Sequence, residues 1–314
     1  MTIGRSGGDR QPAIAVSDLR MRYGTKDVLR GVDFTAHNGE VIALLGPNGA
    51  GKTTTIEILE GFRNRSAGDV EVLGVDPAHG AEAWRAELGV VLQSWRDHGK
   101  WRVRELLRQL GMYYRPYSTE TVQRPHDIDE LIETVGLTAS ADKKISSLSG
   151  GQRRRLDVAI GIVGRPRVLF LDEPTVGFDP HARREFHDLV HRLADLDETT
   201  ILLTTHDLDE AEKLADRILI LVGGRIIADG SADALARRMS TGAEVTWTVD
   251  GERFVHSTME PTDYVRRLFD EHGDKLQDLE VRRATLEETY MEMVRRFEAG
   301  QTDTAIHTFE EVTR

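Results

Sequence analysis

One short run constrains the fold of this 314-residue chain more than any other feature: Gly46-Pro47-Asn48-Gly49-Ala50-Gly51-Lys52-Thr53. It fits the pattern G-x-x-x-x-G-K-[ST] and lies between an apolar run, Ile42 to Leu45, and a segment predicted to be helical from about Gly51 to Glu60. Glycines let a backbone wrap closely around an anion, and the helix N-terminus adds a favourable dipole. A glycine-rich turn with a chance lysine is the simpler alternative, but the flanking strand and helix favour a phosphate-binding loop.

This phosphate loop, residues 46–53, predicts ATP and Mg²⁺ as ligands. Lys52 is expected to reach the β- and γ-phosphates, and the Thr53 hydroxyl is expected to bind Mg²⁺. The residues expected to contact the nucleotide here are Gly46, Pro47, Asn48, Gly49, Ala50, Gly51, Lys52, Thr53 and Thr54.

A pair of acids follows a second apolar run. Val168 to Leu171 is uninterrupted, as is typical of a buried parallel strand, and Asp172-Glu173 comes directly after it. Ligands of doubly wound sheets bind at the carboxyl ends of the strands. We therefore predict that Asp172 binds Mg²⁺, through a water, and that Glu173 polarises the attacking water. A solvent-facing acid pair is the alternative, and the phosphate loop disfavours it.

A second anion-binding element is Leu148-Ser149-Gly150-Gly151-Gln152, which precedes a segment predicted to be helical from Arg153 to Val163. The hydroxyl of Ser149, the glycine N–H groups and the helix N-terminus all favour an anion. The chain thus has two phosphate-binding elements but one lysine loop. A head-to-tail dimer explains this, with the loop of one chain facing the Ser149–Gln152 element of the other across each ATP.

Composition excludes several classes of protein. The net charge is −12, whereas a nucleic-acid binder is expected to carry a basic patch. The chain has no cysteine, which excludes disulfides, thiolate catalysis and cysteine-based zinc sites. No apolar run approaches the roughly 18 residues of a membrane span, and the first twenty residues lack the apolar segment of a signal peptide.

Taken in order, the motifs resemble those of the nucleotide-binding subunit of ATP-binding cassette (ABC) transporters. LSGGQ is the signature of that superfamily, and the resemblance extends over about residues 13 to 236. It implies that Tyr23 stacks on adenine and that Gln93, in Val90-Val91-Leu92-Gln93, meets Mg²⁺ and the attacking water. It also implies that Asp179 lies in a loop crossing the dimer interface and that His206 contacts the γ-phosphate.

Each of these four residues has a simpler interpretation when it is taken alone. Tyr23 would be a half-buried aromatic at a strand end, and Gln93 an ordinary polar side chain. Asp179, before Pro180, would cap the next helix, and His206 would bond to backbone. Only the ordered set of motifs favours the functional roles.

The fold class implied is α/β, a P-loop NTPase cassette with a mostly parallel sheet core, an antiparallel β subdomain and a helical subdomain. A small C-terminal α+β domain follows, with a hairpin signal at Asp250-Gly251 and a capping box formed by Thr285 and Glu288. We expect a flexible leader at 1–12, the ABC ATPase domain at 13–237 with its helical subdomain at about 94–160, the small domain at 238–298 and a mobile tail at 299–314.

Since the chain has no predicted span, a transport function requires a separate multi-spanning membrane subunit, with this chain bound peripherally at the cytoplasmic face of the membrane. Relatives dock that subunit after the position of Gln93, at about Ser94 to Arg104. The sequence here departs from the loop expected in many relatives. Trp95 and Trp101 either anchor a partner helix or pack into the helical subdomain, and packing is favoured.

The C-terminal segment Arg283-Ala284-Thr285-Leu286-Glu287 resembles an R-x-T-L-E element of bacterial drug-resistance exporter subunits of the daunorubicin type. This favours an exporter, with drugs, lipids, polysaccharides and peptides all open as substrates. The two phosphate-binding elements in one chain favour a homodimer. The alternatives are an importer ATPase and a soluble ABC ATPase acting on DNA or ribosomes. Only 120 positions separate Lys52 from Asp172, the chain has a single cassette and its charge is acidic, so no nucleic-acid partner is expected.

Overall fold

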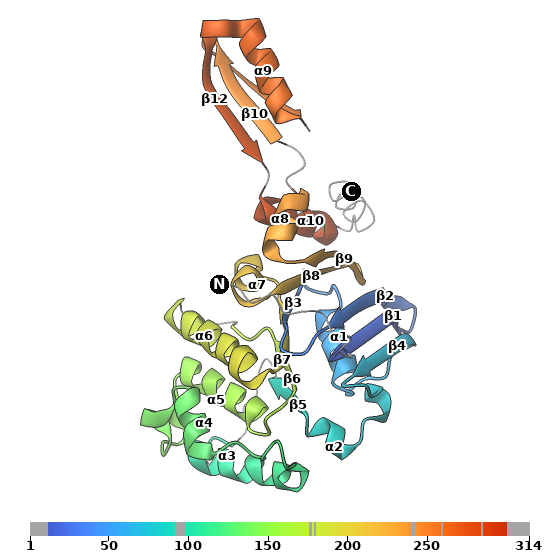
Figure 1. Cartoon of the computed structure of the whole chain (residues 1–314), viewed down its shortest axis with the longest axis vertical. Coiled ribbons are helices and arrows are strands. Elements are labelled where there is room, and N and C mark those ends of the chain that lie inside the picture. The colour runs from blue at the N-terminus through green and yellow to red at the C-terminus, as the bar shows by residue number, and fades with distance from the viewer. Residues whose placement is uncertain are drawn as a thin grey trace. The chain divides into compact units, whose positions relative to one another are not determined.

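The computed structural model describes residues 12–91, 98–175, 178, 180–239, 243–258, 260–283 and 285–299 (Figure 1). The chain divides into two compact units, Met1–Ile226 and Ile227–Arg314. Among the described helices, none has both the length and the apolar character needed to cross a membrane.

A six-stranded sheet forms the centre of the first unit. Its order is β5 (Leu88–Val91), β6 (Val168–Asp172), β7 (Thr200–Thr205), β3 (Val41–Leu45), β8 (Arg217–Val222) and β9 (Arg225–Gly230). The strands from β5 to β8 in this order pair in parallel. The two units divide within β9. Because parallel strands end at the same edge, the residues that follow β3, β6 and β7 meet there.

The register of this sheet brings the predicted motifs together. Asp172, the last residue of β6, pairs with Thr204 of β7, and Leu45, which directly precedes the phosphate loop, pairs with Thr205. The segments that carry Lys52, Asp172 and His206 therefore leave neighbouring strands at the same level.

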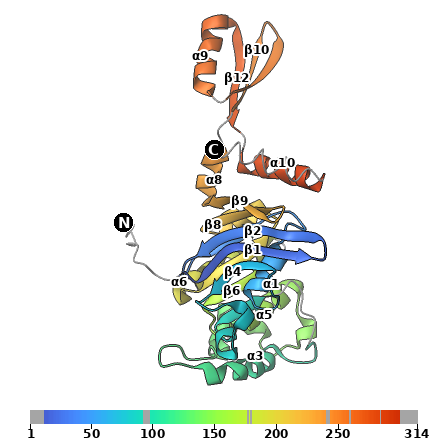
Figure 2. The ribbon, with the colours of Figure 1, turned by 90° about the vertical axis from the view of Figure 1, so that its right-hand side faces the viewer.

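A second sheet is antiparallel, in the order β2 (Lys26–Ala36), β1 (Ile14–Tyr23) and β4 (Ala67–Val72) (Figure 2). Its inward residues, such as Leu19 and Val32, are fully buried and share one core with Ile42, Phe170 and helix α1 (Lys52–Leu59). Helix α1 thus packs in the same core as both sheets, which holds the end of the phosphate loop in place.

Helices form the rest of the first unit. The short α2 (Glu82–Arg85) precedes β5. Next come α3 (Val103–Gly111), α4 (Ile128–Thr134) and α5 (Gly150–Ile162), drawn in green shades in Figure 1. The last helices of this unit are α6 (Pro180–Asp197) and α7 (Leu208–Leu214), which lie on either side of β7 in the chain.

The second unit has helix α8 (Ala232–Met239) and a three-stranded antiparallel sheet in the order β11 (Glu252–Thr258), β10 (Ala243–Val249) and β12 (Leu276–Arg283). Helix α9 (Pro261–His272) packs on this sheet over a core of Val245, Trp247 and Leu268. Helix α10 (Leu286–Glu298) follows β12, and Thr285 caps it.

The elements predicted from the sequence are confirmed for α1, β6, α5 and the capping box of α10. The hairpin at Asp250-Gly251 is also confirmed, since both residues have the positive φ values, 52° and 85°, that a tight turn needs. Strands β1 and β2 are long, and outward-facing charged residues such as Arg20 and Arg22 interrupt the apolar pattern of β1.

Candidate functional site

The phosphate loop connects β3 to α1, and two of its glycines have no room for a side chain. Gly51 has φ 112°, and a Cβ there would lie 2.6 Å from Leu29 Cδ2. A Cβ on Gly46 would lie 2.2 Å from the carbonyl oxygen of Leu221. These positions therefore require glycine for steric reasons, independently of any ligand.

Lys52, the first residue of α1, is buried with 6% of its surface exposed. Its ammonium donates to the Gly46 carbonyl at 2.8 Å and to the Pro47 carbonyl at 3.4 Å, and it lies 3.5 Å from Glu173 Oε1. Burial lowers the pKa of Lys52, and the nearby Glu173 charge opposes that shift. The loop thus folds back on its own lysine, which points at the acid pair.

Thr204 holds the acid pair in place. Its hydroxyl donates to Asp172 Oδ1 at 2.5 Å and accepts from the backbone N–H of Glu173 at 3.0 Å. Glu173 has φ 45°, an uncommon conformation for a residue with a side chain. The Thr204 bond therefore fixes a backbone turn that directs Glu173 away from the strand.

Glu173 stands between two nitrogen-bearing side chains. Its Oε1 atom lies 3.5 Å from Lys52 Nζ and 3.4 Å from His206 Nδ1. Glu173 is largely buried, at 16% exposure, whereas His206 is half exposed, at 51%. The structure thus brings the phosphate-loop lysine, the second acid and the histidine after β7 into one cluster that opens to solvent on the histidine side.

Thr53 and Asp172 supply the oxygens of a candidate Mg²⁺ site. The Thr53 hydroxyl donates to Asp172 Oδ2 at 3.4 Å. In the described part of the chain, no group of three or more His, Cys, Asp or Glu side chains is placed to hold a metal ion. Mg²⁺ typically takes one or two protein oxygens and completes its shell with water and substrate phosphates. The hydroxyl and carboxylate present here fit that preference.

Ser149 begins helix α5 and forms a reciprocal cap with Gln152. The Ser149 hydroxyl accepts from the Gln152 N–H at 3.3 Å, and the Gln152 side chain accepts from the Ser149 N–H at 3.1 Å. Gly150 has open space where a Cβ would stand. Within the described residues, Ser149 to Gln152 make no hydrogen bond or ion pair with the phosphate loop, so one chain does not unite its two phosphate-binding elements.

Arg154 connects α5 to the acid pair, a link that sequence reasoning missed. Its guanidinium is buried and donates to the Pro174 carbonyl at 2.8 Å and to the Asp172 carbonyl at 3.4 Å. Burial lowers the pKa of Arg154, and Asp157 opposes that shift. The three successive arginines after Gln152 gave no signal that this one alone turns inward.

Tyr23 ends β1 with 39% of its surface exposed. The guanidinium of Arg63 lies 5.1 Å from the centre of its ring, within cation–π range. Arg63 in turn donates to Glu57 of α1 at 2.6 Å. The predicted adenine-stacking residue is therefore partly exposed and already connected to the helix that follows the phosphate loop.

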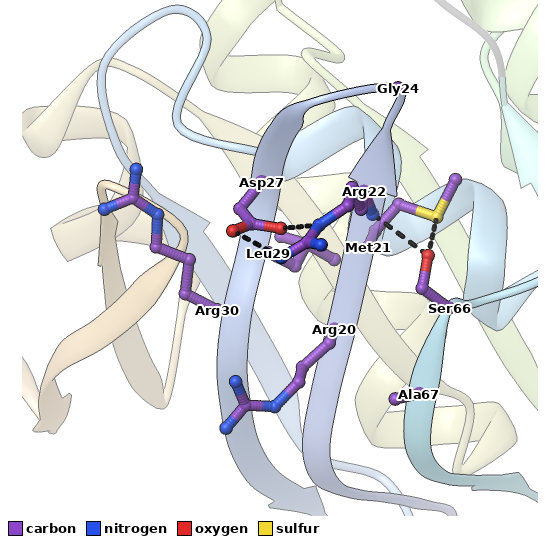
Figure 3. Close-up of a pocket in the computed structure, with 9 residues that line it drawn as sticks. All are labelled: Arg20, Met21, Arg22, Gly24, Asp27, Leu29, Arg30, Ser66 and Ala67. Atoms are coloured by element: carbon purple, nitrogen blue, oxygen red, sulfur yellow. Dashed lines mark hydrogen bonds and ion pairs between the residues drawn. The ribbon is translucent and has the colours of Figure 1, made fainter.

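A pocket of about 410 Å³ is lined by residues of the antiparallel sheet that include Arg22 and Gly24, the sequence neighbours of Tyr23 (Figure 3). The Arg22 guanidinium pairs with Asp27 across the two strands, and Ser66 hydrogen-bonds to the sulfur of Met21. None of the residues of the phosphate loop or of the acid pair lines this pocket. It is therefore a separate feature of the antiparallel sheet.

Three residues singled out in the sequence, Gln93, Asp179 and Trp95, lie outside the described residues, so their expected roles stay predictions. Trp101 does not enter the core, contrary to the favoured prediction: it is 38% exposed and contacts His98 edge-to-face, with ring centres 6.0 Å apart.

Comparison with known proteins agrees with this geometry. Residues 29–176 match the family described as ABC transporter. The chain is 37% identical over 305 residues to the daunorubicin resistance ATP-binding protein DrrA3 of Streptomyces coeruleorubidus, covering 90% of this chain and 95% of that protein. It is 42% identical over 218 residues to the Nod factor export ATP-binding protein I of Neorhizobium galegae, covering 69% of this chain and 62% of that one.

A solved ATP-binding subunit of an ABC transporter has the same fold, with a TM-score of 0.62 and 25% identity over 89% of this chain and 98% of its own. The α/β P-loop cassette expected from the sequence is thereby confirmed. The chain belongs to the ABC transporter family, as an ATP-binding subunit that hydrolyses ATP in coupling to transport.

Proposed function

We propose that this chain is the motor subunit of an exporter, closing as a head-to-tail homodimer on two MgATP molecules to drive a separate membrane subunit. The observation that carries the proposal is the cluster of Lys52, Glu173 and His206 at the ends of β3, β6 and β7. The names of the two relatives, one concerned with drug resistance and one with export, support the direction of transport.

In this mechanism Lys52 leaves its loop carbonyls and binds the β- and γ-phosphates. Glu173 and His206 position a water for attack on the γ-phosphate, and Glu173 accepts a hydrogen bond from that water. Thr53 and Asp172, together with Gln93, would hold Mg²⁺, which would neutralise phosphate charge. Positioning and electrostatic stabilisation supply most of the catalysis in phosphoryl transfer.

The dimer is proposed because, in the described structure, Ser149 to Gln152 make no hydrogen bond or ion pair with the phosphate loop of their own chain. A second copy brings its own Ser149, Gly150 and Gly151 to the γ-phosphate, and its Asp179 to the interface. Tyr23 stacks on the adenine. Hydrolysis then removes the nucleotide contact that holds the two chains together, and the dimer opens.

The proposed location is the cytoplasmic face of the membrane, reached through the membrane subunit. The test is to express a tagged Glu173→Gln chain in its native host, add MgATP, solubilise the membranes gently and identify what co-purifies. A Glu173→Gln/Lys52→Ala chain is the matched control, since it lacks the lysine that binds phosphate.

A multi-spanning membrane protein in matching amount, recovered with Glu173→Gln, is expected, and its sequence would separate an exporter from an importer. Recovery of soluble partners or nucleic acid alone would contradict the transport proposal and favour a soluble ABC ATPase.

A further inference from the structure

The ends of β6 and β7 are joined a second time, beyond the Thr204 bond, by a buried carboxylate. The Thr175 hydroxyl donates to Glu210 Oε1 at 2.5 Å, and the Thr205 hydroxyl donates to Glu210 Oε2 at 2.6 Å. We call this arrangement the threonine–glutamate bridge, formed by Thr175, Glu210 and Thr205. It joins the segment after β6 to the last residue of β7 through one side chain of α7.

The bridge lies in the interior. Thr175 and Glu210 are each 3% exposed, and Thr205 is 2% exposed. Burial raises the pKa of Glu210, while the two threonine hydroxyls oppose that shift. A buried carboxylate is costly unless hydrogen bonds compensate it, so each hydroxyl is needed where it stands.

The backbone around Glu210 is also fixed. Asp207 caps α7 by accepting the Glu210 N–H at 3.3 Å, and it pairs with Arg183 of α6 at 3.2 Å. The Thr205 hydroxyl accepts from the Asp207 N–H at 3.0 Å while donating to Glu210. Glu210 therefore bonds to Thr175 from a helix start that has little freedom to move.

The position of the bridge gives it a consequence for the site. Thr175 comes two residues after Glu173, and Thr205 comes directly before His206. Glu173 has the uncommon φ of 45°, so its segment needs support from both sides to keep that conformation. Thr204 supports the segment at Asp172 and Glu173, and the bridge supports it at Thr175.

We propose that Glu210 is a positioning residue for ATP hydrolysis, which holds Glu173 and His206 at their working separation through Thr175 and Thr205. The inference rests on the proposed roles of Glu173 and His206. Lys52 donates its hydrogen bonds to carbonyls of the phosphate loop and makes none with the bridge. Loss of the bridge should therefore lower the rate of hydrolysis and leave ATP binding largely intact.

The first test is Glu210→Ala in the purified full chain. We expect kcat for ATP hydrolysis to fall by about tenfold or more, with KM and ATP affinity changed by about twofold or less. Asp209→Ala is the matched control, because Asp209 is an acid on the same helix that is 61% exposed and bonds only to Lys213 in the described structure. It is expected to behave as wild type.

A second pair of variants covers the case in which Glu210→Ala does not fold. Thr175→Val has the same shape as threonine without the hydroxyl, and Thr175→Ser keeps the hydroxyl. Thr175→Val is expected to lose kcat and Thr175→Ser to retain most of it, a rescue that a purely steric role of Thr175 would not produce. Equal kcat values for Thr175→Val, Thr175→Ser and wild type would overturn the inference.

The proposed function and this inference fail in different ways. If wild type hydrolyses ATP and Glu173→Gln does not, the proposed function stands, and full activity of Glu210→Ala and Thr175→Val would refute the bridge alone. If Glu173→Gln hydrolyses ATP as fast as wild type, the proposed role of Glu173 fails, and the inference fails with it.

Discussion

The edge of the central sheet where β6 and β7 end differs sharply from the small sheet of the second unit. At the first edge, polar side chains are buried or half-buried and each is held by defined partners: Lys52 by loop carbonyls, Asp172 by Thr204 and Glu210 by two hydroxyls. In the small sheet, the core consists of three buried apolar residues, Val245, Trp247 and Leu268, with half-buried neighbours.

The difference shows where each region gets its stability. The edge where β6 and β7 end belongs to strands that are buried on both faces, so the large core of the first unit supports the polar groups there. The small sheet has one helix on one face and depends on a few side chains. A single substitution should therefore remove function at the first region and structure at the second.

The largest effect is expected from Lys52→Ala. It removes the cation that neutralises phosphate charge, so ATP affinity should fall by about 100-fold or more. The fold should be kept, because the core around α1 does not depend on the ammonium. Isothermal titration with ATP, beside a thermal melt, measures both. Near-wild-type ATP affinity would refute the assignment of the phosphate loop.

The small sheet should respond to Trp247→Ala by losing structure. Trp247 is buried and contacts Phe254 and Tyr264, with ring centres 5.6 and 5.7 Å away. Truncation of a buried tryptophan costs about 3–5 kcal/mol, which a core of three residues is not expected to withstand. Hydrogen exchange should become fast in β10 to β12 while β3, β6 and β7 keep their protection. Slow exchange throughout would show that the small sheet has stability from another source.

A pH dependence should arise from Glu60, at the end of α1. Burial, with Asp172 and Glu57 adding negative charge nearby, raises its pKa to about 8. The folded state then holds a proton that the unfolded state releases near pH 4.5, so the free energy of unfolding should decrease as pH rises from about 5 to 8.

Glu60→Gln removes this group and should flatten that pH dependence, raising the melting temperature at pH 8 more than at pH 5. Both chains are to be melted without nucleotide or Mg²⁺. Parallel pH profiles for the two chains would contradict the assignment.

The smallest effect is expected from Thr285→Ala, which removes the N-cap of α10. The Thr285 hydroxyl accepts the Glu288 N–H at 3.1 Å, and such caps contribute about 1 kcal/mol. Thr285→Ser keeps the bond and serves as the control. Urea denaturation, together with a separate measurement of hydrogen exchange in α10, should distinguish the two variants. Identical exchange in both would show that the cap does not stabilise α10.

Much of the candidate site could be predicted from the sequence because several of its residues stand in short local motifs. Lys52, Asp172 and Ser149 stand in patterns whose spacing is set by a loop, a strand end or a helix start, so neighbouring residues are sufficient to recognise them. Thr204 and Glu210 were missed because the partners of Thr204, and the Thr175 partner of Glu210, lie 31 to 35 positions away. Only the register of β6 against β7 brings such residues together.

The fold shows the same limit. Apolar runs such as Val168 to Leu171 identified the buried strands, whereas β4 and β12 were missed. In β12, only Leu276, Leu279 and Val281 are apolar, and the remaining residues are polar or charged. The pairing with β10, and not local hydrophobicity, therefore defines this strand.

Single-turnover hydrolysis of ATP by the Glu173→Gln chain, with ATP affinity measured on the same preparation, tests the role of Glu173 most directly. We expect the affinity to stay within about threefold of wild type and the rate of hydrolysis to fall by about 100-fold or more. A Glu173→Gln chain that binds ATP and hydrolyses it at the wild-type rate would contradict the account, because the carboxylate between Lys52 and His206 would then have no part in the reaction.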